Sequence, residues 1–246
     1  MGVWEDLGRE LDAWGEAARL ATLWWRDDDA VAPTAALARL HELAAAHDLV
    51  PALAVVPRDA APSLPGEALL QHGYAHINHG LKKKAELGPE RPAASVVGEL
   101  AGGRRRLLDL FAGRVLPVLA PPWNRIAPEV VALLPGLEFR GLSTFRARAA
   151  AEAAPGVTQV NTHVDLIDWR ERRFAGDEPT LGALIGHLAD RRLGRADAGE
   201  PTGLLTHHLV HDEPAWGFLA RLFAVTRAHP AIRWLTPAQA FGLASA

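Results

Sequence analysis

The sequence predicts an α/β protein built on a largely parallel sheet. Short apolar runs alternate along the chain with longer segments whose apolar residues recur at helical spacing. About seven or eight such strand–helix units are present, and this alternation is typical of βαβ topology. Units in this number fit an α/β barrel as well as an open sheet.

The first half of the chain supplies four strands and two helices of this pattern. Leu37, Leu40 and Leu43 recur at helical spacing and predict a helix over residues 34–46. A second helix is expected over 95–111. The apolar runs predict strands over residues 22–26, 51–56, 68–71 and 115–120.

The second half continues the alternation. Pro128 near the first turn favours a helix over residues 127–134, and Thr236 followed by Pro237 predicts the cap of a last short helix. The alanine-rich residues 147–154 fit either a helix or a surface excursion. Strands are expected over 138–142, 157–164, 202–206 and 232–235, with helices over 181–192 and 214–227.

Composition narrows the class of protein. The chain has 246 residues and a net charge of −3, which argues against a nucleic-acid binder. Barrels of roughly this length are often single domains, so one domain over residues 1–246 is expected. Cysteine is absent, which excludes disulfides, thiolate zinc sites and cysteine nucleophiles. Any metal must therefore be held by nitrogen and oxygen ligands.

The chain shows no membrane or export signal. Its N-terminus is acidic and amphipathic and lacks the basic and apolar regions of a secretory leader. The longest stretch without Lys, Arg, Asp or Glu covers residues 68–81, which is 14 residues. A spanning helix needs ~20 apolar residues, so no transmembrane segment is predicted. The expected location is cytoplasmic.

Two polar clusters suggest a metal site. Asp27, Asp28 and Asp29 follow an apolar run, and their mutual repulsion would be relieved by a cation or by a basic neighbour. A turn with a helix N-cap is the alternative. His72 and His76 are four residues apart and would share a face of a helical turn, as two ligands of one metal do. His79, three residues after His76, fits a shared face too, so spacing alone leaves the pair open.

A third cluster contains His207, His208 and His211 after the apolar residues 204–205. Histidine titrates near neutral pH, so one of these side chains is a candidate general acid. A solvent-facing loop is the alternative. Six of the 11 histidines lie in residues 72–79 and 206–211, which favours a functional reading of both segments together.

Two further segments are candidates for lining a cavity. Asn161, His163 and Asp165 point to one side of a predicted strand, and a polar strand face between apolar runs suggests a lined cavity or a solvated edge. Pro121 and Pro122 stiffen the exit from the strand at 115–120 and fix the direction of the residue that follows, which is Trp123.

Taken in order, these clusters resemble the five motifs of the polysaccharide deacetylases, carbohydrate esterase family 4, also called the NodB-homology domain. Residues 25–29 stand where the family has Thr-Phe-Asp-Asp-Gly, and His72 and His76 match its His-x-x-x-His motif. The resemblance covers residues 25 to about 235. It implies a distorted (β/α) barrel of about seven parallel strands. The later motifs are matched by Asp165, Asp168 and Trp169, and by Leu204, Leu205 and His207.

The resemblance also implies roles. Aligning Asp27 with the first acid of the family places Thr34 where a helix-opening Thr belongs, which makes Asp27 the general base. Asp28 then becomes a metal ligand together with His72 and His76. Asp29 replaces the family's Gly, so the choice between Asp28 and Asp29 stays open. The implied cofactor is a divalent ion, Zn²⁺ first, with Co²⁺, Mn²⁺, Fe²⁺ or Ni²⁺ as alternatives.

The remaining roles concern the leaving group and the substrate. The resemblance makes His207 the general acid and Asp165 its partner. Trp169 and Trp123, which replaces a Tyr common in the family, are candidates to stack on a sugar or to wall the acyl pocket. Leu205 is the candidate contact for the acetyl methyl group, and Arg125 is a further candidate for substrate binding.

One departure from the family pattern affects catalysis directly. The family's third motif begins with an Arg that holds the catalytic Asp, and this chain has Ala120 there. Arg125 or Arg26 could supply that charge instead.

The implied function is a metal-dependent hydrolase that removes an acetyl or other acyl group from an N-acylated amino sugar or a related small molecule. Water on the metal would attack the amide carbonyl. The alternatives are a metal hydrolase of a non-sugar amide or ester and a catalytically silent carbohydrate-binding barrel, which Ala120 favours. A carbohydrate or small-molecule substrate is the expected partner.

Overall fold

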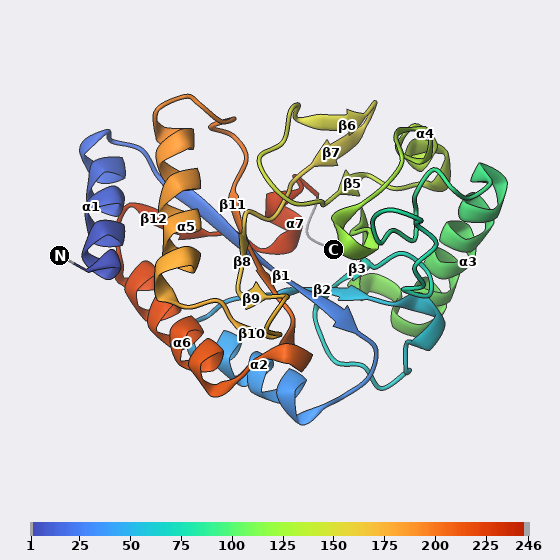
Figure 1. Cartoon of the computed structure of the whole chain (residues 1–246), viewed down its shortest axis with the longest axis horizontal. Helices are drawn as coiled ribbons and strands as arrows, with labels where there is room; N and C mark the ends of the chain where they lie inside the picture. The colour runs from blue at the N-terminus through green and yellow to red at the C-terminus, as the bar shows by residue number, and fades with distance from the viewer. Residues whose placement is uncertain (1, 244–246) are drawn as a thin grey trace.

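The computed structural model describes residues 2–243 and consists of one large, mostly parallel sheet with helices around it (Figure 1). The order of its strands is β6-β7-β5-β4-β3-β2-β1-β11-β8, and β12 pairs with the start of β1. All of these pairings are parallel except that between β6 and β7. The strand bounds are β1 (Ala21–Ala30), β2 (Ala52–Val55), β3 (Ala68–Gln71), β4 (Val115–Leu119), β5 (Gly141–Leu142), β6 (Glu152–Ala154), β7 (Val157–Gln159), β8 (Val164–Asp165), β11 (Thr202–Thr206) and β12 (Ile232–Trp234).

The two ends of the sheet meet in one stretch of extended chain, residues 157–165. Its first part, β7, pairs with β5, and its last part, β8, pairs with β11. Between them the backbone N–H of Thr162 donates to Thr144, and that of His163 donates to Gly203. If β7 and β8 are counted as one strand, seven parallel strands follow one another around a distorted barrel, as the resemblance implied. A small antiparallel pair, β9 (Ile167–Asp168) and β10 (Arg173–Phe174), follows β8.

The helices occupy the expected positions, with one addition. Helix α1, which the sequence did not predict, packs beside α5, and its Trp4 donates from Nε1 to Asp177 at 2.6 Å. The helix expected over residues 127–134 is the short α4 followed by a 3₁₀ turn. The alanine-rich segment 147–154 ends in the antiparallel strand β6 and is not a helix. The bounds are α1 (Val3–Glu16), α2 (Ala35–Ala46), α3 (Ala93–Phe111), α4 (Pro128–Val131), α5 (Asp177–Arg192), α6 (Glu213–Ala228) and α7 (Pro237–Ala240).

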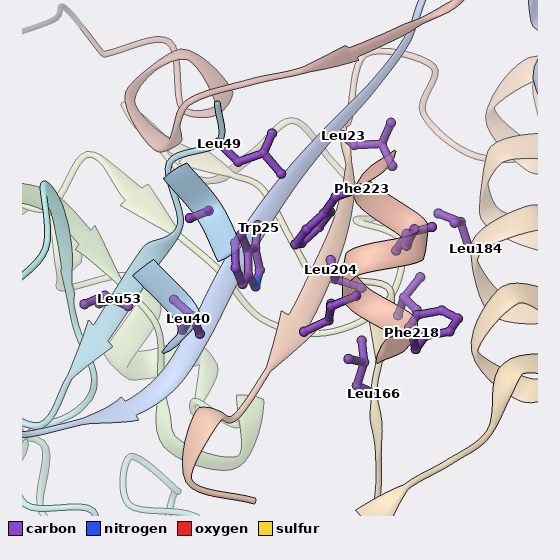
Figure 2. Close-up of a cluster of buried hydrophobic side chains, with 14 of the residues drawn as sticks. Leu23, Trp25, Leu40, Leu49, Leu53, Leu166, Leu184, Leu204, Phe218 and Phe223 are labelled. Carbon is purple, nitrogen blue, oxygen red and sulfur yellow. The ribbon is translucent and has the colours of Figure 1, made fainter. Parts of the chain in front are cut away.

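Adjacent residues of β1 serve two different cores, because side chains alternate across a strand. Trp25 points to the helical layer, where its ring lies 4.8 Å from that of Phe223 on α6 (Figure 2). Trp24 points the other way and packs with Leu70 of β3, Val118 of β4 and Phe241, which follows α7. Both faces of β1 are therefore apolar up to Arg26, where its polar end begins.

Within residues 2–243, no helix is long and apolar enough to span a membrane.

Candidate active site

The candidate site lies where β1, β3 and β11 end, at the carboxyl edge of the barrel. This is the edge at which sites form in parallel α/β folds. The alternation along β1 places Arg26 and Asp28 on the barrel side and Asp27 on the helical side. The pairing of β1 with β2 shifts register between Asp27 and Ala30, and Asp29 has a left-handed φ of 70°. This irregularity turns Asp29 away from the side that Asp27 faces.

Asp29, His72 and His76 form the central group of the site. The Nε2 atoms of both histidines lie 3.2 Å from Oδ1 of Asp29. That oxygen is buried and has no hydrogen-bond partner among the residues described. Nδ1 of His72 lies 2.8 Å from the carbonyl oxygen of Ala120. Because a carbonyl only accepts, this bond puts a proton on Nδ1, so in the neutral ring the lone pair is on Nε2.

The three side chains fit a divalent ion. Two ring nitrogens and a carboxylate oxygen converge within 4.8 Å of one another. Such atoms are the ligands that zinc prefers, and three protein ligands leave the open position of a catalytic site. The bond from His72 to Ala120 is the outer hydrogen bond that orients a ligating imidazole.

The loop after β3 is constrained so that both histidines reach Asp29. The buried carboxylate of Glu86 accepts the N–H of Tyr74 at 3.1 Å and that of Ala75 at 2.7 Å. A Cβ on Gly73, whose φ is +58°, would lie 1.9 Å from Glu86, so only glycine fits there. His76 itself has a φ of 55°, and its ring lies 4.4 Å from that of Trp123. Strained backbone of this kind concentrates at functional sites.

Asp28 does not join this group, although the sequence favoured it as the ligand. Its carboxylate is held by the guanidinium of Arg26, with Nε to Oδ1 at 2.8 Å and Nη2 to Oδ2 at 3.1 Å. Arg26 is fully buried, and it also donates to the hydroxyl of Ser143 at 2.7 Å and to Oδ1 of Asn124 at 2.6 Å. The geometry therefore groups Asp29, the alternative left open, with the histidines.

Asp27 lies on the far side of β1 and is fully buried. Its Oδ2 accepts the hydroxyl of Thr206 at 2.6 Å and the N–H of His208 at 3.0 Å, and its Oδ1 pairs with Nδ1 of His208. Burial by itself raises the pKa of Asp27, but the charge and hydrogen bond of His208 outweigh it and lower that pKa. Asp27, expected as the general base, thus faces the helical layer, and both of its carboxylate oxygens already have hydrogen-bond partners.

His207 faces the site from the end of β11. Its Nε2 lies 4.0 Å from Oδ2 of Asp28, and its ring meets that of Trp169 edge-on at 4.6 Å. Asp165, expected as its partner, accepts instead from the N–H of Ile167 and from Nε1 of Trp169, at 3.0 and 2.8 Å. Burial raises the pKa of Asp165 despite the nearby His207.

The expected substrate-binding residues surround the site unevenly. Trp169 is 46% exposed, whereas Leu205 is buried within β11 in register with Arg26. Trp123 adopts a left-handed φ of 55° that directs its ring to His76. Arg125 is exposed and donates to the carbonyl oxygen of Lys84 at 2.7 Å, so it is not the charge that replaces the family's arginine at Ala120.

In the group of Asp29, His72 and His76, the pKa values of the two histidines shift in opposite directions. Burial raises the pKa of Asp29, but the neighbouring His72 outweighs this and holds it well below its ordinary value. Burial lowers the pKa of His72, but the charges of Asp28 and Asp29 outweigh it and raise that pKa. The pKa of His76 is lowered by burial and by His72.

The sequence analysis assigned no role to three residues that position the site. Ser143 and Asn124 accept hydrogen bonds from Arg26, and Glu86 holds the loop after β3. Arg26 was considered as a basic neighbour that relieves the repulsion of the three acids and as one of two arginines that could replace the family's. Its position two residues before Asp28 on a predicted strand was a usable signal, because such residues share a face. The other three reach the site from separate elements and carry no local signal.

A second group pairs two histidines with an acid, away from this site. His163 directly precedes β8, His187 lies on α5 and Glu200 precedes β11, and all three are buried. The rings of His163 and His187 are stacked, with centroids 3.5 Å apart and planes 15° from parallel. Of the other histidines, His79 is exposed, and the ring of His211 packs edge-on against Trp216 at 4.5 Å.

No protein-family model matches the chain, and no curated protein matches it in sequence. Solved structures do match it. A chitin deacetylase from the fungal pathogen Colletotrichum lindemuthianum superposes with a TM-score of 0.55 at 14% identity, over 92% of this chain and 89% of that one. The chain has the polysaccharide deacetylase fold.

Two further structures agree on the deacetylase fold. A peptidoglycan N-acetylglucosamine deacetylase matches with a TM-score of 0.56 at 16% identity, over 92% of this chain and 90% of that one. A family 4 carbohydrate esterase from Streptomyces lividans, solved in complex with acetate, matches with a TM-score of 0.52 at 14% identity, over 87% of this chain and 90% of that one. The fold that the motif resemblance implied is thereby confirmed.

Proposed function

We propose that the chain is a metal-dependent deacetylase acting on the N-acyl group of an amino sugar or a related small molecule. The observation that carries this proposal is the convergence of Nε2 of His72 and His76 on the unpaired Oδ1 of Asp29, on a deacetylase fold. These three residues would hold a divalent ion, with Zn²⁺ the first candidate. Such an ion supplies Lewis acidity toward a carbonyl and lowers the pKa of water to about 7.

Asp28 is the base in this proposal. It lies next to the ligand Asp29 on the barrel side of β1, and the bidentate contact with Arg26 fixes the direction of its carboxylate. Its oxygens would accept the proton of the attacking water. The arginine that the family places in its third motif is then supplied by Arg26, from the same strand as the base. Ala120, which favoured a silent barrel, is thus compensated.

His207 is the acid in this proposal. Its Nε2 lies 4.0 Å from Oδ2 of Asp28, so both groups would be within reach of one substrate amide placed beside them. Protonation of the leaving amine by Nε2–H would complete the hydrolysis. Trp169, edge-on to His207 and hydrogen-bonded to Asp165, would keep that ring in place and screen it from solvent.

The test compares adjacent carboxylates. The purified protein should hold about one divalent ion per chain, measured by inductively coupled plasma mass spectrometry, and Asp29→Ala should lose it. Asp28→Asn should keep the ion but reduce acetate release about 10²- to 10⁴-fold, the usual contribution of a general base. Acetate is measured with chitooligosaccharides, peptidoglycan fragments and acetylated xylan.

Asp27→Asn is the matched control, because it makes the same charge change one residue away on the other face of β1. It should keep both the ion and acetate release within about tenfold of the wild type, a smaller effect than loss of a general base. Full activity of Asp28→Asn would refute its role as the base. A protein that binds no divalent ion, even after incubation with zinc, would refute the hydrolase proposal.

A further inference from the structure

A large cavity lies beside the candidate site and is not used by the proposed chemistry. Its volume is about 980 Å³, within the range of small-molecule sites. The metal group does not line it. Asn124 does, and the same Asn124 accepts a hydrogen bond from Arg26, which holds Asp28. The cavity therefore adjoins the pair of Arg26 and Asp28 through Asn124.

The walls of this cavity are mostly hydrocarbon. The apolar lining comes from α4, from the segment before it, and from β5 and β6, and consists chiefly of Ile126, Ala127, Val131, Leu142, Ala153 and Ala154. No aromatic ring contributes among the residues that the structure describes. The hydroxyl groups of a sugar would lose hydrogen bonds with water against such walls, which is costly. The lining suits an alkyl chain better than it suits a second sugar.

Positively charged side chains also line this cavity. Lys82, Lys83 and Arg125 line it, against a single acid, Glu90. Both lysines are exposed, and within residues 2–243 neither forms an ion pair with an acidic side chain. Two unpaired ammonium groups next to an apolar cavity complement a ligand that is anionic at one point and apolar beyond it.

We propose that this cavity binds the part of the substrate remote from the scissile amide, and that this part is an alkyl chain carrying a phosphate or similar anion. The inference rests on the proposed function, since it names the substrate class of the same site: an amphiphilic phosphate ester of an N-acylated amino sugar. The alkyl chain occupies the apolar walls, and Lys82 and Lys83 bind the anion.

Binding of alkyl phosphates, measured by titration calorimetry below their micelle concentrations, tests this without any turnover. Across hexyl, octyl and decyl phosphate, Kd should fall about threefold to fourfold per methylene, as for burial in an apolar cavity. Octyl phosphate should bind at least about tenfold more tightly than inorganic phosphate or octyl glucoside, because each of these lacks one of the two recognised groups. A Kd independent of chain length would overturn the proposal.

Two pairs of variants locate the site. The double variant Lys82→Glu, Lys83→Glu should weaken octyl phosphate about tenfold or more, whereas Lys84→Glu, in the same run but outside the cavity lining, should not. Ala154→Trp would occupy part of the cavity and should weaken the chain-length dependence. Ala151→Trp, on an exposed residue outside the lining, is its control. Equal effects within either pair would overturn the assignment to this cavity.

A lipid surface is the competing source of the same chemistry, because Leu81, next to Lys82, is 88% exposed. Binding to phosphatidic acid vesicles without binding of monomeric octyl phosphate would replace the cavity by a surface and overturn the proposal. Acetate release from chitooligosaccharides without alkyl phosphate binding would refute only the cavity proposal. Alkyl phosphate binding by a protein that binds no divalent ion, even after incubation with zinc, would refute only the deacetylase proposal.

Discussion

Two groups in this molecule each bring two histidines and one carboxylate within 4.8 Å, yet only one of them fits a metal ion. At the barrel edge, the bond from Nδ1 of His72 to a carbonyl places the lone pair of the neutral ring on Nε2, facing Asp29. In the second group, Nδ1 of His163 accepts the N–H of Gly203 at 2.9 Å. The proton of the neutral ring is then on Nε2, 3.4 Å from Glu200, where a ligand would need a lone pair.

Ring geometry separates the two groups as well. The lone pair of an imidazole nitrogen lies in the ring plane, and the planes of His163 and His187 run nearly parallel with centroids 3.5 Å apart. An ion about 2.0–2.1 Å from both nitrogens would have to leave at least one of those planes. The rings of His72 and His76 are 5.2 Å apart and tilted by 33°, so they can converge. Residue type and proximity therefore do not define a metal site without proton placement and ring direction.

The carboxylates of the two groups, Glu200 and Asp29, differ in their hydrogen-bond partners. Glu200 accepts the N–H of Arg148 at 2.9 Å and that of Asn161 at 3.0 Å, so it ties together segments that close the barrel. Asp29 has a left-handed backbone, and its buried Oδ1 has no hydrogen-bond partner among the described residues. The second group therefore contributes stability, whereas the first includes a strained backbone and a carboxylate oxygen open to an ion.

The largest expected effect is a loss of folding stability when the second group, His163, His187 and Glu200, loses its carboxylate. Glu200→Ala leaves two buried N–H donors and His163 without their acceptor, so it should lower the free energy of unfolding by about 3–5 kcal/mol. Urea unfolding followed by circular dichroism measures this. The metal content should stay unchanged. A variant that lost its metal while keeping its stability would reverse the roles given to the two groups.

The second group should also make the stability of the fold depend on pH, through His187. The pKa of His187 is lowered by burial, and further by His163, from an ordinary 6.5 to about 2. The unfolded chain binds this proton below pH 6.5 and the folded protein does not. The contribution of the neutral ring is therefore complete above pH 6.5 and is lost as the pH falls toward 2, by about 1.4 kcal/mol per unit.

The measurement is urea unfolding between pH 7 and pH 5 of the wild type and of His187→Phe, which keeps a ring stacked on His163. The variant should show a flatter dependence on pH, whatever its absolute stability. Identical slopes would mean that His187 is not the residue that takes up the proton on unfolding.

The smallest expected effect is the backbone strain at Asp29. In the metal-free protein, Asp29→Gly should be about 1 kcal/mol more stable than Asp29→Ala, because both variants lack the carboxylate and only glycine adopts the φ of 70° without strain. Thermal unfolding in the presence of a chelator measures the difference. Equal stability of the two variants would show that the backbone at Asp29 is not strained.

Much of the fold could be read from local patterns. Strand β3 was predicted over residues 68–71 and β11 over 202–206, both with the observed bounds, because each is a short apolar run between polar residues. The Thr236 cap of α7 was predicted as well. Helix α1 was missed, although Leu7, Leu11 and Trp14 are buried at helical spacing. Residues 157–164 were expected as one strand, but the role of this segment in joining β5 to β11 has no local signature.

The sequence by itself determined which residues could carry the chemistry: three consecutive acids after an apolar strand, and His72, His76 and His207 after two others. It did not determine which acid does what. Strict alternation along β1 would put Asp29 on the same side as Asp27, facing the helical layer. The register shift against β2 and the left-handed backbone turn Asp29 to the histidines, while Arg26 takes Asp28. A shift of this kind depends on how the neighbouring strand pairs, so only the tertiary structure could decide it.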